Sequence, residues 1–235
     1  MAHGTPTTQS TIAPAAPAPP TTVAEPHPPV AWKVAGALGI THVVLILGGI
    51  SLQAPVLFEE GRAGIGRLVD ADLPRSVAGG YVELVGFLLL IPVMVFVARA
   101  VGRTPTGRWA AQSALVAGGA YVALTFSPGL AAGATAMHAA QNGVGIDTVW
   151  SMNNLRVITY VVSLMLLGAH AIGVGVAARA DGFSPRLVGA GGLVAGACLL
   201  TAPLLLAAGL HDLATLLWSL WWVGLSVQLM RRSGR

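Results

Sequence analysis

The amino-acid sequence predicts an all-α integral membrane protein, a polytopic transmembrane bundle of six helices. Only 9% of its 235 residues are charged and 54% are hydrophobic, whereas about 25% of a soluble domain is charged. Apolar runs long enough to cross a bilayer recur along the chain. The net charge of +4 does not indicate nucleic-acid binding, because the basic residues stand at the ends of these runs rather than in one patch.

The chain is predicted to have two parts. Residues 1–31 contain eight prolines and six threonines and have little to bury, so we expect a disordered Pro/Thr/Ala-rich tail. A signal peptide is not expected, because the positive n-region is missing and the first apolar run begins only after Lys33. Residues 32–232 are the predicted transmembrane domain.

Within that domain, charged connections separate six apolar spans. A short interfacial helix is expected at residues 65–69, in the first connection. Ser127-Pro128-Gly129 should end or kink the third span, so the stretch from Leu130 to Gly143 is either an outer helical turn or a re-entrant segment. The spans are predicted at about 34–53, 80–99, 109–128, 157–178, 187–209 and 213–230.

The distribution of basic residues predicts the orientation. With six spans, one side receives nine of the thirteen Lys and Arg residues, and the other side receives Arg62, Arg67, Arg75 and Arg156. Because basic residues accumulate in the cytoplasm, both termini are predicted to be cytoplasmic (N-in/C-in). A bacterial plasma membrane is the expected location, and the lipid bilayer is the expected partner.

Ionisable side chains inside the membrane are the first candidates for a site, because each costs roughly 2.5–3.5 kcal/mol at a helix centre on insertion scales. Glu83 lies about one turn inside the second span and Arg156 begins the fourth span, at similar depth. Glu83 is either a solvated acid at a helix start, favoured by the macrodipole, or the partner of Arg156. Asp212 begins the last span on the same side.

Polar residues at helical spacing follow two of the spans. Arg156, Thr159, Ser163 and His170 share one face of the fourth, while Asp212, Thr215, Ser219, Trp222 and Ser226 share one face of the sixth. Such stripes predict a shared polar seam or water-filled cleft, or else the ordinary hydrogen bonding of membrane bundles. The ligand-binding hypothesis comprises Glu83, Arg156, Asp212, Thr159, Ser163, His170, Ser219 and Trp222.

No catalytic residue, cofactor or metal is assigned from the sequence. His42 and His170 offer the ligands of a membrane haem, but neither span has the second histidine of a two-haem bundle. His138, His211, Asp212 and Glu83 share one side without the spacing of a metal motif. We therefore expect His42 and His170 to be hydrogen-bonded structural residues rather than ligands.

Gly192 and Gly196 form a GxxxG pair in the fifth span, which indicates close helix packing. The packing lies either inside the bundle or between protomers, so a homo-oligomer or a membrane partner through these glycines stays open. Nucleic acid is not an expected partner.

Two segments carry a resemblance. The turn Gly182-Phe183-Ser184-Pro185-Arg186-Leu187-Val188-Gly189 resembles the G-x-x-P-R-x-x-G turn of a family of uncharacterised bacterial six-span membrane proteins, a domain of unknown function common in actinobacteria. The end of the chain, from Trp218 to Arg232, resembles that family's terminal helix. The resemblance implies six helices and a plasma-membrane location, and it carries over no known activity.

Three functions are compatible with these observations. The first is a membrane protein without enzymatic activity that binds or passes a small molecule through an outer-facing polar cleft lined by Glu83, Arg156 and Asp212. The second is a subunit of a membrane assembly. The third is a haem- or metal-dependent redox protein. The expected inverted repeats of many transporters are not evident, which argues against transport.

Overall fold

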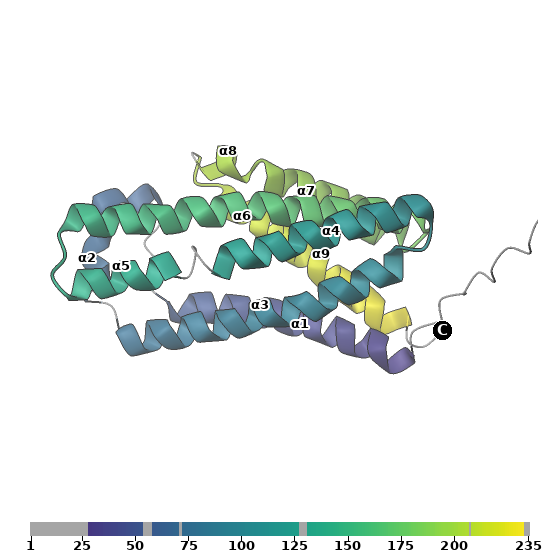
Figure 1. Ribbon diagram of the computed structural model, residues 1–235, viewed down its shortest axis with the longest axis horizontal. Coiled ribbons are helices and arrows are strands. Elements are labelled where there is room, and N and C mark those ends of the chain that lie inside the picture. The colour runs from purple at the N-terminus through teal and green to yellow at the C-terminus, as the bar shows by residue number, and fades with distance from the viewer. Residues whose placement is uncertain (1–27, 54–57, 71, 127–130, 207, 233–235) are drawn as a thin grey trace, which may run out of the picture.

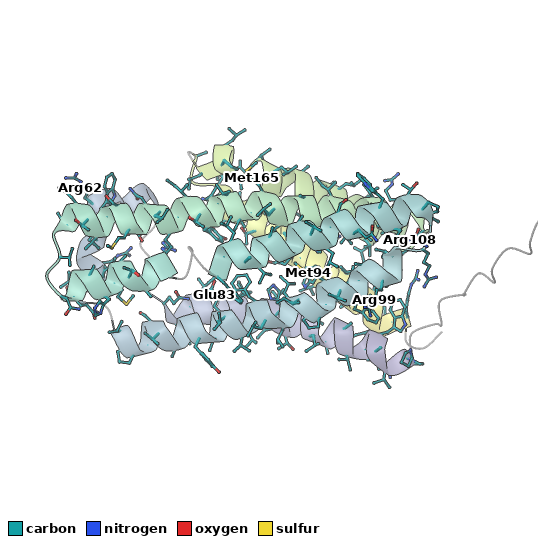
Figure 2. All side chains as sticks on the ribbon, viewed as in Figure 1. Arg62, Glu83, Met94, Arg99, Arg108 and Met165 are labelled. Carbon is teal, nitrogen blue, oxygen red and sulfur yellow. The ribbon has the colours of Figure 1, made fainter. Side chains whose placement is uncertain are left out.

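A computed structural model describes residues 28–53, 58–70, 72–126, 131–206 and 208–232, and every regular element in those ranges is a helix. The helices form an elongated bundle (Figure 1). One end, which we call the basic end, holds the start of α1, the end of α9 and the connection from α3 to α4. Figure 2 shows Arg99 and Arg108 there and Arg62 at the opposite end, which we call the α5 end.

The first two long helices begin earlier than predicted. α1 (Pro29–Leu52) takes in three residues that the sequence assigned to the tail, because Pro29 fits the first helical turn, where no N–H is needed. Residues 1–27 lie outside the described ranges. α3 (Leu73–Val101) starts well before residue 80 because Asp72 caps it, accepting a hydrogen bond from the Arg75 N–H at 3.0 Å.

α4 (Pro105–Leu124) also starts before its predicted position at Trp109. Thr104 caps it, since its hydroxyl oxygen accepts the Gly107 N–H at 3.0 Å. The predicted end of this span at residues 127–128 lies outside the described ranges.

The stretch after the third span forms α5 (Ala131–Gln141), an 11-residue helix. It packs against the first turns of α6 (Ile146–Ala180) and against the predicted short helix, α2 (Gly66–Val69), which is preceded by η1 (Phe58–Ile65). α6 has 35 residues, about 52 Å, so it is longer than a hydrocarbon core of about 30 Å. These segments enclose a small second core at the α5 end, whose buried side chains include Leu68, Ala136, Met137 and Val149.

The fifth span is interrupted rather than continuous. It consists of η3 (Pro185–Ala190), α7 (Gly191–Leu200) and α8 (Ala202–Leu206). The break falls at Thr201, and Pro203 just beyond it has no N–H to continue the helical ladder. The last helix, α9 (His211–Arg232), matches the predicted sixth span closely.

Within the described ranges, four helices are long and apolar enough to cross a membrane, namely α1, α3, α6 and α9. α4 has 20 residues but falls outside that set, as does the shorter apolar helix Arg186–Leu200. The prediction of an all-helical membrane bundle is confirmed at this level. α3 packs against α1 and α4, α6 against α4 and α7, and α9 against α1 and α7.

The turn between α6 and η3 has a local physical explanation. Gly182 has φ +66°, a left-handed conformation that glycine adopts without strain. A Cβ on Gly189 would lie against the Arg179 side chain. Between the two glycines, Phe183 is buried, its ring stacked 6.2 Å from that of Trp32 and covered by the Arg232 guanidinium at 4.0 Å.

Candidate functional site

Two opposite charges lie within electrostatic range of each other in the half of the bundle nearer the α5 end. Glu83 on α3 and Arg156 on α6 are both half-buried and interact electrostatically. Gln53 donates a hydrogen bond from its amide to the Glu83 carboxylate at 2.7 Å, and Arg156 Nε donates to the Asn153 side-chain oxygen at 3.3 Å. In Figure 2, Glu83 lies at the level where α4 ends. The structure therefore brings together the two charges that the sequence placed at similar depth.

Small residues let the backbone approach this pair. A Cβ on Gly49 of α1 would lie 2.8 Å from the Glu83 nitrogen, so α1 packs directly on α3 beside the carboxylate. A Cβ on Gly133 of α5 would lie 2.7 Å from the Arg156 Cδ. α5 therefore packs against the Arg156 side chain.

Tyr160 connects the pair to α9. Its ring lies in α6, one helical turn after Arg156, and its hydroxyl is 3.3 Å from the Thr215 hydroxyl. Tyr160 lies near Glu83, Arg156 and Asp212. The Asp212 side chain itself is 74% exposed and lies 3.6 Å from His211 Nε2, so it stands at the surface beside the site.

On the side of Glu83 and Arg156 that faces the basic end, hydroxyl groups join α4 to α6. The Thr125 hydroxyl lies 2.8 Å from the Tyr121 carbonyl oxygen and 3.3 Å from the Ser163 hydroxyl. Ser163 donates to the Tyr160 carbonyl oxygen at 2.7 Å. Thr125 and Ser163 are both buried, so this contact is a polar link inside the bundle.

The two predicted polar stripes, one on α6 and one on α9, make few contacts with each other. Thr159 is buried on α6, whereas Ser219 donates at 2.9 Å to the Thr215 carbonyl oxygen of its own helix. Contacts between α6 and α9 are sparse. The Tyr160–Thr215 contact is one of them. Another, which joins the two stripes, is between the rings of His170 and Trp222, whose centroids are 5.9 Å apart.

The histidines of the core lie at different levels of the bundle. His42 Nδ1 is 2.8 Å from the Gly86 carbonyl oxygen, and His170 Nδ1 is 2.9 Å from the Ala114 carbonyl oxygen. The rings of Trp218 and Trp222 stack between them with centroids 5.3 Å apart. A haem held by both histidines does not fit this arrangement, because the two indoles occupy the space that it would take.

The outer histidines are also separated. His138 lies near the end of α5, where the Asn142 amide contacts it, while His211 opens α9. Within the described ranges, no three His, Cys, Asp or Glu side chains come close enough to hold a metal ion.

The glycine pair of the fifth span packs inside the chain. A Cβ on Gly196 would lie 2.6 Å from the Gly168 carbonyl oxygen, and one on Gly192 would lie 2.8 Å from the Ala171 carbonyl oxygen, both on α6. Of the two alternatives, packing inside the bundle is the one observed for these glycines.

Sequence reasoning missed the uncharged members of the site. Gln53, Tyr160, Tyr121 and Thr125 complete the polar half, and all four stand in or beside apolar runs. An amide or phenol in such a run is a signal of a polar site, but it is weaker than a charged side chain or a stripe of polar residues along one helix. Comparisons of the chain with family models, with curated proteins and with solved structures found no match.

Proposed function

We propose that this chain is a six-helix integral membrane protein of the bacterial plasma membrane, with both termini in the cytoplasm. Its function, in this proposal, is to bind a small polar molecule that reaches Glu83 and Arg156 from the α5 end. The observation that carries the proposal is the placement of two opposite charges inside the bundle, where unpaired polar groups are costly.

Several features support the six-span topology. α4 has 20 residues, about 30 Å of helix, and packs along α6. The start of α1 and the end of α9 lie at the same end of the bundle (Figure 1). That end is the one with the excess of arginine, which favours the cytoplasmic side. The resemblance of the Gly182–Gly189 turn to a six-span family points the same way.

Cysteine accessibility tests the topology. In a Cys198→Ala background, single cysteines replace Thr106, Ser151, Arg186 and Ala208, which are all exposed. A membrane-impermeant thiol reagent added to intact cells should label Ser151→Cys and Ala208→Cys only. Labelling of Thr106→Cys or Arg186→Cys from outside would contradict the six-span, N-in/C-in arrangement.

The geometry suggests what the site recognises. A carboxylate and a guanidinium within electrostatic range of each other offer one partner for each end of a zwitterion, and Tyr160 and Thr215 add two hydroxyl groups 3.3 Å apart. On α3, Phe87 lies one turn nearer the basic end than Glu83. The centroid of its ring is 5.7 Å from that of Tyr121. An aromatic surface below a carboxylate suits an organic ammonium group.

Ligand-dependent thermal stability tests the binding. The purified protein in nanodiscs is titrated with amino acids, betaine, monocarboxylates, primary amines and neutral sugars. We expect the melting temperature Tm to rise with a zwitterion and to remain unchanged with a sugar. The double variant Glu83→Gln/Arg156→Gln, which keeps the net charge, should lose this rise.

The matched control is the exposed ion pair of Arg62 and Asp147, 2.9 Å apart at the α5 end. The double variant Arg62→Gln/Asp147→Asn makes the same change in charge and should keep the ligand response. If no probe raises Tm, or if the rise survives in Glu83→Gln/Arg156→Gln, the proposed binding site is wrong.

A second candidate function, a subunit of a membrane assembly, rests on a different face. A shallow apolar groove of about 400 Å³ runs between η3, α7 and α9. It is lined by Leu187, Ala190, Gly191, Val194, Leu217, Leu220 and Trp221. Val194 is 57% exposed on this groove, whereas Val116, 74% exposed, lies on α4. In the Cys198→Ala background, Val194→Cys should crosslink to a partner in native membranes and Val116→Cys should not; recovery of monomer alone from both would count against an assembly.

A further inference from the structure

Four aromatic rings form a continuous column through the middle of the bundle. The centroids of His42 and Trp218 are 6.0 Å apart, those of Trp218 and Trp222 are 5.3 Å apart, and those of Trp222 and His170 are 5.9 Å apart. All four side chains are at most 3% exposed. The column thus links α1, α9 and α6 at the base of the polar half.

Three polar atoms of this column have no partner among the described residues. They are His170 Nε2, Trp218 Nε1 and Trp222 Nε1. His170 Nδ1 faces the Ala114 carbonyl oxygen at 2.9 Å, so Nδ1 carries the proton of the neutral ring and Nε2 presents a lone pair. The two indole nitrogens are donors only. The column therefore buries one acceptor and two donors that have no protein partner among the described residues.

Such a combination is unusual in a native core, where buried polar groups are almost always hydrogen-bonded. The neighbouring tryptophan shows the ordinary case, since Trp221 Nε1 donates to the Val188 carbonyl oxygen at 3.2 Å. The remaining requirement at the column is a molecule that both accepts and donates hydrogen bonds. Water has this chemistry, carries no charge to desolvate, and typically makes about three hydrogen bonds when buried.

We propose that the column of His42, Trp218, Trp222 and His170 is an internal hydration site, in which buried water accepts from the two indole N–H groups and donates to His170 Nε2. This places buried water as deep in the bundle as the level of His170. Below that level the helices meet through apolar side chains such as Val97, Val174 and Leu225, each at most 1% exposed, where water has no polar partner. This site does not depend on ligand binding at Glu83, and its test uses no ligand.

Water-to-indole magnetisation transfer in the full-length protein, reconstituted in lipid and labelled with ¹⁵N-tryptophan, tests the site. Single Trp→Phe variants assign the indole signals. Trp109 is 70% exposed and serves as the hydrated reference, and Trp221, bonded to a carbonyl, serves as the dry reference. We expect the Trp218 and Trp222 N–H groups to receive signal from water at a rate close to that of Trp109.

Thermal unfolding of the same variants gives an independent readout. Removing a satisfied donor is destabilising, whereas removing an unsatisfied one is neutral or stabilising. Trp218→Phe and Trp222→Phe should therefore lower Tm at least as much as Trp221→Phe, which removes a known bond from the same helix. Transfer to Trp218 and Trp222 no faster than to Trp221 overturns the hydration site, and so does a Tm loss confined to Trp221→Phe.

Discussion

In the half of the bundle nearer the α5 end, α3, α4 and α6 contribute charged, phenolic and hydroxyl side chains, whereas in the other half the same helices meet through small and apolar ones. Glu83, Arg156 and the Thr125–Ser163 contact belong to the first half. Fully buried Val97, Ala171 and Ala178 belong to the second. Because α3 and α6 run without a break through both halves, the difference between the halves of these two helices lies in their side chains.

The two halves are suited to different tasks. Polar groups inside a membrane bundle cost free energy unless they are paired, so their concentration in one half indicates a function there. The other half gains its cohesion from close contact between backbones. A Cβ on Gly173 of α6 would lie 2.9 Å from the Ala110 carbonyl oxygen of α4. We infer that the half nearer the α5 end recognises a ligand and that the half nearer the basic end holds the helices together.

The largest effect is expected where two backbones touch in the apolar half. Gly175 of α6 lies so close to η3 that a Cβ would be 2.7 Å from the Gly189 carbonyl oxygen. Gly175→Ala should lower the free energy of unfolding by about 3 kcal/mol, the upper part of the range for overpacking. Denaturant titration of the purified protein in micelles measures it.

The same substitution at Gly119 is the control. Gly119 lies in α4 with nothing within 4 Å of the added Cβ, so Gly119→Ala should be neutral or stabilise the helix by up to about 1 kcal/mol. Equal losses in both variants would show that the apolar half is not closed by backbone contact.

A smaller effect distinguishes the carboxylates of the two ends. Asp181 at the basic end accepts hydrogen bonds from the N–H groups of Arg103 and Thr104 and from the Thr104 hydroxyl. Asp181→Ala should cost about 2 kcal/mol, since bonds to a charged acceptor are worth about 1.5–3 kcal/mol. It removes the link between the α3–α4 connection and the end of α6.

Asp147 at the α5 end is the matched case. It pairs with Arg62 at 2.9 Å, but the two side chains are 70% and 60% exposed, and exposed pairs contribute about 0–1 kcal/mol. Asp147→Ala should therefore change the free energy of unfolding by less than Asp181→Ala does. If Asp147→Ala lost more free energy of unfolding than Asp181→Ala in the same denaturant titration, the carboxylate at the basic end would not be the more stabilising one.

The sequence was sufficient for the membrane bundle because the signal for it is compositional. Long uncharged runs such as the one after Glu83 predict helices whatever their neighbours are. Helix starts were less accurate, since the caps Asp72 and Thr104 and the leading Pro29 lengthen helices beyond the apolar run itself. The break at Thr201 was missed although Pro203 marks it, because the run from 187 to 209 carries no charge.

The site was only partly predictable for a geometric reason. Depth along a helix can be counted from the sequence, which is why Glu83 and Arg156 were matched. The neighbours of each helix cannot be counted in this way. The fourth span packs on α4 and α7 rather than along α9, so the stripe of Thr159, Ser163 and His170 has α4 as its main partner, and Thr125 was overlooked.

The smallest effect concerns the hydroxyl contact that makes the polar half polar. Thr125 and Ser163 lie 3.3 Å apart between α4 and α6, and interhelical hydrogen bonds in membrane proteins average about 0.6 kcal/mol. A double-mutant cycle with Thr125→Val and Ser163→Ala should give a coupling free energy of about that size. Ser226→Ala is the control, because its hydroxyl donates to the Trp222 carbonyl oxygen within α9 and should show no coupling to Thr125→Val. A zero coupling for Thr125 and Ser163 would mean that this contact adds no cohesion to the fold.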